Sequence, residues 1–175
     1  MQQTLQPLSM IYNEKSGFHS AKNDEVYEQL MTYWSDCGFE IQVFDIASEN
    51  DISILMNKVK QRHQSKDNHG VIVAAGGDGT LNAVASQLLH QDIPMGIIPL
   101  GTFNYVARVL DIPIDVMAAA EVIAKGKPRK IHVAKINEHI YLNNASLGLY
   151  PLFIEKRELY NQKFCLLRSE FFLRS

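Results

Sequence analysis

The chain has 175 residues, of which 46% are hydrophobic and 21% charged, so it can bury a core of its own and is not a disordered polypeptide. Its formal net charge of −2 argues against a dedicated nucleic-acid-binding protein, because such proteins are usually basic. The first residues lack a signal-peptide pattern, no stretch approaches the ~18 apolar residues of a membrane span, and the cysteines match no metal-ligand spacing, so we expect a cytoplasmic protein.

Strands and helices are expected to alternate along the first part of the chain. The expected strands cover residues 8–12, 39–46, 71–75 and 95–98, and the expected helices cover residues 24–37, 51–63, 80–89, 103–110 and 116–125. The run of residues 71–75 is continuously apolar, which is typical of a strand covered on both faces in a parallel sheet. The alternation predicts a doubly wound α/β domain with right-handed crossovers.

The pattern changes after Lys125. Residues 130–136 and 140–145 are expected strands with no helix between them, as in a hairpin. We therefore predict an α/β domain over residues 1–128 and the incomplete beginning of a second domain over residues 129–175. Because two strands cannot form a stable domain alone, the second part either leans on the first or belongs to a larger protein that is truncated here.

Three glycine-rich or polar loops each follow a predicted strand: residues 13–17, 76–80 and 99–104. Ligands of an open parallel sheet bind at the carboxyl ends of its strands. If the strands are parallel, the three loops converge on one edge of the sheet. We therefore expect a ligand site at that edge.

The loop of residues 76–80 has the strongest chemical signal. Gly76, Gly77 and Gly79 allow backbone conformations closed to other residues and a close approach to a phosphate, and the following helix directs unpaired N–H groups at an anion. Thr80 can cap that helix or donate its hydroxyl to a phosphate. Asp78 would repel a phosphate unless a cation or a transferred proton intervenes, which indicates magnesium held through water or activation of an attacking hydroxyl. The alternative is a glycine turn with a helix-capping aspartate.

The same turn is neither a Walker A loop nor a dinucleotide fingerprint. A Walker A loop needs Gly-Lys followed by Ser or Thr, and no such sequence occurs. The dinucleotide fingerprint needs a third glycine where Asn82 stands. Hydride transfer therefore has little support.

The other two loops add candidate phosphate partners. The first loop offers Asn13, Lys15, Ser16 and Gly17, unless it is a plain surface turn. The third loop offers Gly101, Thr102 and Asn104.

Two groups of basic residues have alternative interpretations. Arg108 lies one helical turn after Asn104 and either reaches a phosphate or forms a surface salt bridge. The basic stretch of residues 125–130 either meets anionic lipid headgroups or is a solvated linker.

At these loops the sequence resembles the catalytic domain of diacylglycerol kinases, a family that includes bacterial lipid kinases and the sphingosine and ceramide kinases. The resemblance covers residues 8–151 and is strongest at GGDGTLN (residues 76–82) and PLGTFN (residues 99–104). YNEKSG at residues 12–17 resembles the first loop of the family. GGDGT alone is shared with NAD kinases, and its pairing with PLGTFN favours the lipid kinases.

The resemblance implies that ATP lies across the three loops with magnesium near Asp78, which is also the candidate catalytic residue. The implied ATP-binding residues are Asn13, Lys15, Ser16, Gly17, Gly76, Gly77, Asp78, Gly79, Thr80, Asn82, Gly101, Thr102 and Asn104. The sequence departs from the family pattern at Glu14, Ala83 and Tyr105, and the last two replace common acidic residues. The resemblance also implies that residues 129–175 begin a β-sandwich lipid-binding domain, whose acidic catalytic base has no match in this chain.

The sequence therefore predicts an ATP-dependent lipid kinase that transfers the γ-phosphoryl group to a lipid hydroxyl such as that of diacylglycerol. The predicted setting is the cytoplasm, with peripheral association at the inner face of the membrane. The alternatives are a kinase of a soluble substrate, like NAD kinase, and a nucleotide-binding module without catalysis. If the second domain is incomplete, exposed Phe164, Phe171 and Phe172 would favour a homo-oligomer.

Overall fold

The computed structural model of the chain describes residues 5–13, 24–64 and 70–142. Four parallel strands form one sheet in the order β2–β1–β3–β4. Their bounds are Gln6–Tyr12 for β1, Phe39–Asp45 for β2, Val71–Gly76 for β3 and Met95–Pro99 for β4. Five helices accompany the sheet among these residues: α1 (Asp24–Asp36), α2 (Ile52–Gln61), α3 (Asp78–Leu88), α4 (Tyr105–Val109) and α5 (Val116–Lys125).

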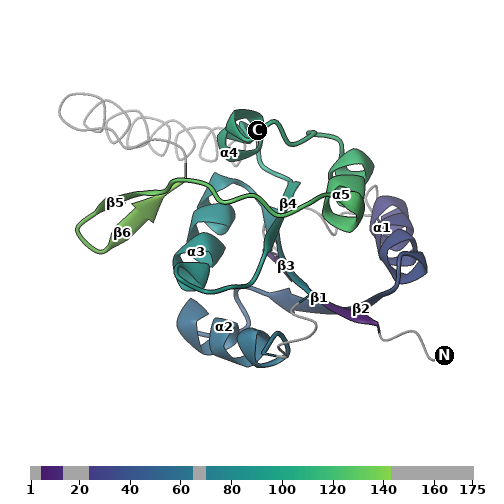
Figure 1. Ribbon diagram of the computed structural model, residues 1–175, viewed down its shortest axis with the longest axis horizontal. Coiled ribbons are helices and arrows are strands. Elements are labelled where there is room, and N and C mark those ends of the chain that lie inside the picture. Colours follow the sequence, from purple (N-terminus) through teal and green to yellow (C-terminus); the bar gives the residue numbers. More distant parts are fainter. Residues whose placement is uncertain (1–4, 14–23, 65–69, 143–175) are drawn as a thin grey trace, which may run out of the picture. The chain divides into compact units, whose positions relative to one another are not determined.

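Helices cover both faces of the sheet (Figure 1). On one face, Trp34 of α1 and Ala120 of α5 pack in a core with the side chains of β1 and β3, and the Trp34 indole N–H donates to the Ala120 carbonyl oxygen at 3.2 Å. On the other face, α2, α3 and α4 pack around Ile11, Ile72 and Ile97. Every residue of β3 is buried, as expected for a central strand with two covered faces. The predicted doubly wound α/β fold is confirmed.

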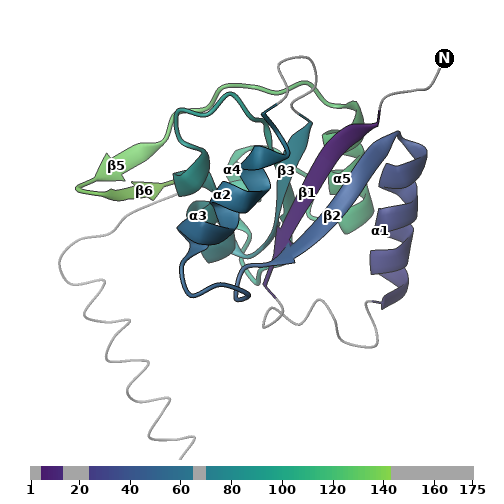
Figure 2. The same cartoon turned by 90° about the horizontal axis from the view of Figure 1, so that it is seen from below.

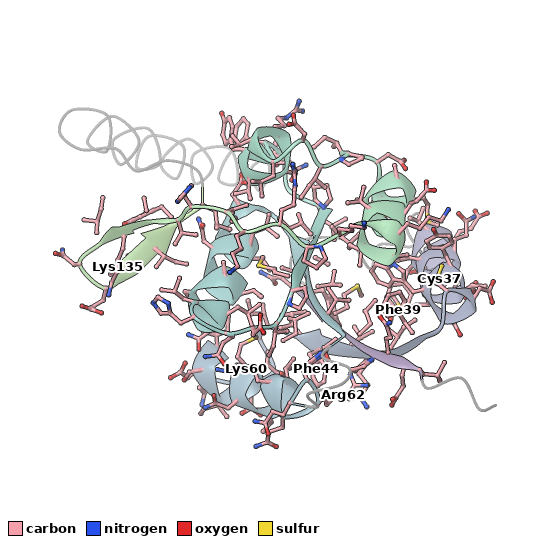
Figure 3. All side chains as sticks on the ribbon, in the orientation of Figure 1. Cys37, Phe39, Phe44, Lys60, Arg62 and Lys135 are labelled. Carbon is pink, nitrogen blue, oxygen red and sulfur yellow. The ribbon has the colours of Figure 1, made fainter. Side chains whose placement is uncertain are left out.

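A buried polar cluster lies between β1 and the end of α2. The Ser9 hydroxyl lies 2.9 Å from His63 Nε2 and accepts a hydrogen bond of 2.9 Å from Arg62 Nη1. Ser9 and His63 are both almost completely buried. Figure 3 labels Arg62 at the end of α2, beside β1 and β2. The cluster satisfies polar groups that would otherwise be costly inside the core.

The chain after α5 differs from its prediction. A two-stranded antiparallel hairpin forms from β5 (Ala134–Ile136) and β6 (His139–Tyr141), around a turn in which Asn137 has a φ of 53°. Residues 130–133 were predicted as strand but pair with nothing, because no neighbouring strand lies beside them among the described residues. Residues 143–145 of the second predicted strand lie outside the described residues.

The hairpin belongs to the same compact unit as the sheet, a unit that extends to Asn143. Ile140 is buried, and the Leu142 N–H donates to Asn82 Oδ1 of α3 at 3.0 Å. Figure 2 shows the hairpin as an arm beside α3. The division near residue 128 and the start of a second β domain stay predictions.

Among the described helices, none has the length and apolar character needed to cross a bilayer.

Candidate functional site

A cleft of about 470 Å³ lies at the carboxyl ends of the strands. It is lined by Asn13, Ile46, Gly77, Gly79, Thr80, Leu100 and Gly101. These residues follow β1, β2, β3 and β4, so each strand of the sheet contributes to the lining. In the sheet, β2 lies on one side of β1 and β3 lies on the other side. The strand order therefore reverses at β1. Open α/β sheets bind ligands at such a point, and the cleft lies there.

The start of α3 forms one wall of the cleft. Gly77 is the N-cap residue, with an extended backbone and no side-chain capping bond, and the first helical hydrogen bond runs from the Leu81 N–H to the Gly77 carbonyl oxygen at 3.1 Å. Within the described part of the chain, no hydrogen bond engages the N–H groups of Asp78, Gly79 and Thr80. Unpaired N–H groups at a helix start carry partial positive charge. This wall is therefore suited to an anion.

The glycines around the cleft are needed for space and not for an unusual φ. A positive φ occurs at none of Gly76, Gly77, Gly79 and Gly101. The expectation that these glycines adopt backbone conformations closed to other residues is therefore wrong. A Cβ atom on Gly76 would lie 2.7 Å from the Thr80 side chain, and one on Gly101 would lie 2.6 Å from Gly77 Cα. The second and third loops therefore touch backbone to backbone.

Gly79 is the exception among these glycines. A Cβ atom there would meet nothing within 4 Å, and Gly79 is exposed and lines the cleft. Its missing side chain leaves open the space that a ligand at the start of α3 would occupy.

Asp78 joins the second loop to the third. Its Oδ2 accepts the Tyr105 N–H at 3.2 Å and its Oδ1 accepts the Val106 N–H at 2.9 Å. These are the first N–H groups of α4, so Asp78 caps a helix, although not the one in which it lies. Each carboxylate oxygen keeps a further lone pair for another donor.

The third loop is fixed by its own side chain. Asn104 is buried, has a φ of 51° and accepts the Gly101 N–H on its Oδ1 at 2.8 Å. The Leu100 N–H donates to the Gly76 carbonyl oxygen at 3.0 Å, which joins the ends of β3 and β4. Thr102 is exposed and does not line the cleft.

The predicted site residues fall into three groups. Asn13, Gly77, Gly79, Thr80 and Gly101 line the cleft. The structure places the others around it, as loop supports or on the surface: Gly76, Asp78, Asn82, Thr102 and Asn104. Lys15, Ser16 and Gly17 lie outside the described residues.

Ile46 and Leu100 also line the cleft and were not predicted. Ile46 directly follows β2, and its N–H donates to the Tyr12 carbonyl oxygen at 2.8 Å. The rule that selected the other loops could have found it, because the predicted strand of residues 39–46 ends at this position. Leu100 lies inside the PLGTFN motif, but an apolar residue carried no signal for a phosphate site.

The structure shows the surroundings of Arg108, the first of the two groups of basic residues. Arg108 Nε donates to the Phe103 carbonyl oxygen at 3.1 Å, and no ion pair involves Arg108 among the described residues. The alternative of a surface salt bridge therefore has no support there.

The basic stretch begins at the opposite edge of the sheet from the cleft. A Cβ atom on Gly96, near the start of β4, would lie 3.0 Å from Ile123 near the end of α5, so residues 125–130 leave α5 at the amino ends of the strands. In Figure 2 this segment runs along the edge from which β1 starts.

A larger hollow of about 600 Å³ lies between α1 and β2 and is a poorer candidate. It is lined mainly by apolar and aromatic side chains, including Phe39, Ile41 and Tyr27. Figure 3 labels Phe39 between α1 and the sheet. Burial raises the pKa of the Tyr27 phenol, which disfavours charge on that side chain.

No cluster of three or more His, Cys, Asp or Glu side chains suited to a metal ion occurs among residues 5–13, 24–64 and 70–142. Asp78 is tied to two of the cleft loops through the Tyr105 and Val106 N–H groups, and Asp45, next to the cleft-lining Ile46, accepts the Ala47 N–H at 3.1 Å. Magnesium in nucleotide sites commonly takes one or two carboxylates together with phosphate oxygens and water. The donor set fits a magnesium ion that arrives with a nucleotide, and does not fit a cage made by protein alone.

Comparison with known proteins agrees with the geometry. Residues 7–136 match the family described as the diacylglycerol kinase catalytic domain. A diacylglycerol kinase of Staphylococcus aureus (strain bovine RF122 / ET3-1) is 32% identical over 141 residues, which are 79% of this chain and 42% of that protein. A diacylglycerol kinase of Staphylococcus haemolyticus (strain JCSC1435) is 31% identical, over 79% of this chain and 41% of that protein.

The fold is similar to that of a crystal structure of a diacylglycerol kinase from Bacillus anthracis str. Sterne. The TM-score is 0.61 at 22% identity, and the match covers 77% of this chain and 45% of that one. The chain thus spans less than half the length of these relatives.

Proposed function

Because the chain belongs to the diacylglycerol kinase catalytic domain family, we propose that it binds ATP in the cleft and forms the nucleotide-binding part of a lipid kinase. The kinase would transfer the γ-phosphoryl group to a lipid hydroxyl such as that of diacylglycerol. The observation that carries the proposal is the open start of α3, which faces a cleft walled by Gly77, Gly79 and Gly101.

The phosphates of ATP bind at that helix start. The N–H groups of Asp78, Gly79 and Thr80 donate to phosphate oxygens, and the dipole of α3 favours the negative charge. The Thr80 hydroxyl and the Asn13 side chain add polar contacts from the two sides of the cleft. Lys15, Ser16, Gly17 and Thr102 remain proposed ATP contacts on the basis of the family resemblance.

Gly76, Asn82 and Asn104 act behind the cleft in this proposal. Gly76 makes room for Thr80, and Asn104 holds the Gly101 N–H. Asn82 holds the Leu142 N–H through its side-chain oxygen, which leaves its NH₂ group for a nucleotide.

Asp78 has two proposed roles. It fixes the second and third loops relative to each other through the Tyr105 and Val106 N–H groups. Its remaining lone pairs would hold a water of a magnesium ion bound to the ATP phosphates, and that ion would supply charge neutralisation during transfer.

The reaction would form a bond between the lipid oxygen and the γ-phosphorus as the bond from that phosphorus to the β–γ bridging oxygen breaks. ADP leaves, and the hydroxyl proton passes to a base. Positioning and charge neutralisation are the main contributions of a protein to such a transfer. The proposed setting is the cytoplasmic face of a membrane, where the lipid acceptor resides.

Calorimetric titration of the chain with Mg-ATP tests the nucleotide site. We expect binding with a 1:1 stoichiometry, and competition by ADP. Heat changes no larger than those of dilution, in a chain that circular dichroism shows to be folded, would remove the proposal.

The acceptor is tested with radiolabelled ATP and diacylglycerol vesicles, using a protein that carries this chain together with the remaining length of its relatives. Labelled phosphatidic acid is the expected product. A labelled product from NAD and none from lipid would favour the soluble-substrate kinase. Mg-ATP binding without any turnover would favour the non-catalytic module.

A further inference from the structure

Exposed apolar side chains gather on α4 and the turn before it. Phe103 is 63% exposed, Tyr105 49% and Val109 67%. We call these three residues the α4 patch. The other large apolar side chains with high exposure in the described part of the chain come from separate elements, whereas these three lie within seven residues.

The α4 patch is held in a fixed arrangement. The Phe103 and Tyr105 rings stack with their centroids 5.4 Å apart and an interplanar angle of 12°. Val109 follows Tyr105 by one helical turn, on the same side of the helix. Beneath the patch, Val106 and Ala107 are fully buried, so α4 is apolar on its core face and on its outer face. A surface helix facing only water normally has a polar outer face.

A cation accompanies the patch. Arg108 lies between Tyr105 and Val109 in sequence, is exposed and is anchored through Nε to the Phe103 carbonyl oxygen. No ion pair among the described residues involves Arg108. Of the neighbouring acids, Asp78 accepts the Tyr105 and Val106 N–H groups, and Asp111 is exposed beyond the helix. Aromatic rings, an aliphatic side chain and an arginine together suit the boundary between acyl chains and phosphate headgroups.

The α4 patch lies on the cleft side of the sheet. Gly101 lines the cleft two residues before Phe103, and the Tyr105 N–H is bound to Asp78 at the start of α3. The basic stretch of residues 125–130 starts at the opposite edge. The α4 patch and the basic stretch both have features that suit lipid. Among the described residues, only the α4 patch adjoins the nucleotide cleft.

We propose that the α4 patch is the surface by which this chain contacts a bilayer with anionic phospholipid headgroups. The stacked rings and Val109 enter the interface while Arg108 meets headgroup phosphates, so that the cleft is held beside the lipids. The purpose of this contact rests on the proposed lipid kinase function. The contact itself can be measured without ATP or turnover.

A tryptophan reporter tests the contact directly. The chain has one tryptophan, Trp34, which is fully buried, so its emission is insensitive to a surface contact. In Phe103→Trp we expect a blue shift when vesicles of phosphatidylcholine and phosphatidylglycerol are added, without ATP or diacylglycerol. The matched control is Val122→Trp on α5, where Val122 is 44% exposed, and there we expect no shift. No shift in F103W, or an equal shift in V122W, overturns the proposal.

Vesicle co-sedimentation provides a second measurement. Loss of two interfacial rings in the F103A/Y105A variant should reduce partitioning by about tenfold or more. Arg108→Gln should weaken binding to anionic vesicles and leave binding to pure phosphatidylcholine unchanged. Unchanged partitioning of F103A/Y105A contradicts the proposal. Calorimetry with Mg-ATP on the same samples keeps the two ideas apart: absent ATP binding rejects the proposed function, and vesicle data alone decide the α4 patch.

Discussion

Helices α2 and α3 begin in opposite ways. At α2 the N-cap residue Asp51 accepts the Ser53 N–H on its carboxylate at 2.8 Å, and at α5 Asp115 accepts the Ala118 N–H at 2.9 Å. At α3 the N-cap is Gly77, which has no side chain to do this. Where no ligand is expected, the chain satisfies its helix start with its own side chain. At the cleft it leaves the start of α3 open.

Helix α3 has an aspartate near its start, but the side chain of this residue caps a different helix. Asp78 stands one residue after the N-cap and caps the start of α4 instead. The N-cap residue of α4, Asn104, in turn holds the Gly101 N–H. The two cleft loops therefore stabilise each other, and the N–H groups of α3 are left for a ligand. Substitutions at four positions break or sharpen this contrast.

The largest expected effect is at Gly101, where the two loops touch. Gly101→Ala places a Cβ atom 2.6 Å from Gly77 Cα and 2.9 Å from Asn104 Oδ1, and neither neighbour can move without shifting a loop. We expect a loss of about 3 kcal/mol in the free energy of unfolding, measured by urea denaturation, as for other overpacked sites. Wild-type stability of G101A would mean that the loops are not in contact.

Asp78→Ala tests the cap that crosses between the loops. It removes the acceptor of two N–H groups, so we expect a loss of about 2 kcal/mol in unfolding free energy. Asp78→Asn keeps one oxygen that can accept the Val106 N–H, and its stability should fall between D78A and wild type. Equal stability of all three chains would contradict the assigned cap. If D78N folds well but loses Mg-ATP affinity, the carboxylate charge itself contributes to binding.

Gly79→Ala tests the open space beside Gly79, in contrast to the packed space beside Gly101. A Cβ atom at Gly79 meets nothing within 4 Å, and alanine is a better helix former than glycine, so stability should rise by up to about 1 kcal/mol. The same methyl group enters the cleft, so Mg-ATP binding should weaken strongly in calorimetry. Unchanged affinity in G79A would place the phosphates away from the start of α3. G101A and G79A thus change the same residue type with opposite expected effects on stability.

Local sequence patterns were sufficient to predict the α/β framework. The apolar run of residues 71–75 identified β3 within one residue, and Gly38 marks the end of α1, where its φ is 88°. The expected α4 of residues 103–110 is shorter in the structure, Tyr105–Val109, because Asn104 takes a left-handed conformation to reach Gly101. The predicted α3 start at Thr80 lies instead at Asp78.

The details of the cleft could not be predicted in the same way. The partners of Asp78 lie 27 and 28 residues further along the chain, and only the pairing of β3 with β4 brings them together. Sequence spacing alone therefore left a helix cap and a metal site as alternatives for Asp78. It did not indicate that the capped helix is the neighbouring α4. The close approach of the glycines to a phosphate stays a prediction, and the unusual backbone conformations expected of them do not occur. The contact between Gly101 and Gly77 was not predicted, since which backbone faces Gly101 depends on the tertiary fold.

The smallest expected effect is at α2, the capped helix start of the comparison. The Ser53 N–H, and next its hydroxyl, hold the pKa of the Asp51 carboxyl below its ordinary value. A carboxylate with a lowered pKa contributes stability that is complete above its unfolded-state pKa and is lost as the pH falls through the folded one. Asp51→Asn keeps an oxygen that can cap the helix but carries no charge and does not titrate, so D51N should be slightly less stable than wild type near neutral pH and its thermal stability should fall less steeply in acid. Asp36→Asn, at the end of α1, controls for the loss of one surface charge. If D51N and D36N follow the same acid profile, the charge of Asp51 does not stabilise α2, and the contrast with the open start of α3 rests on hydrogen bonding alone.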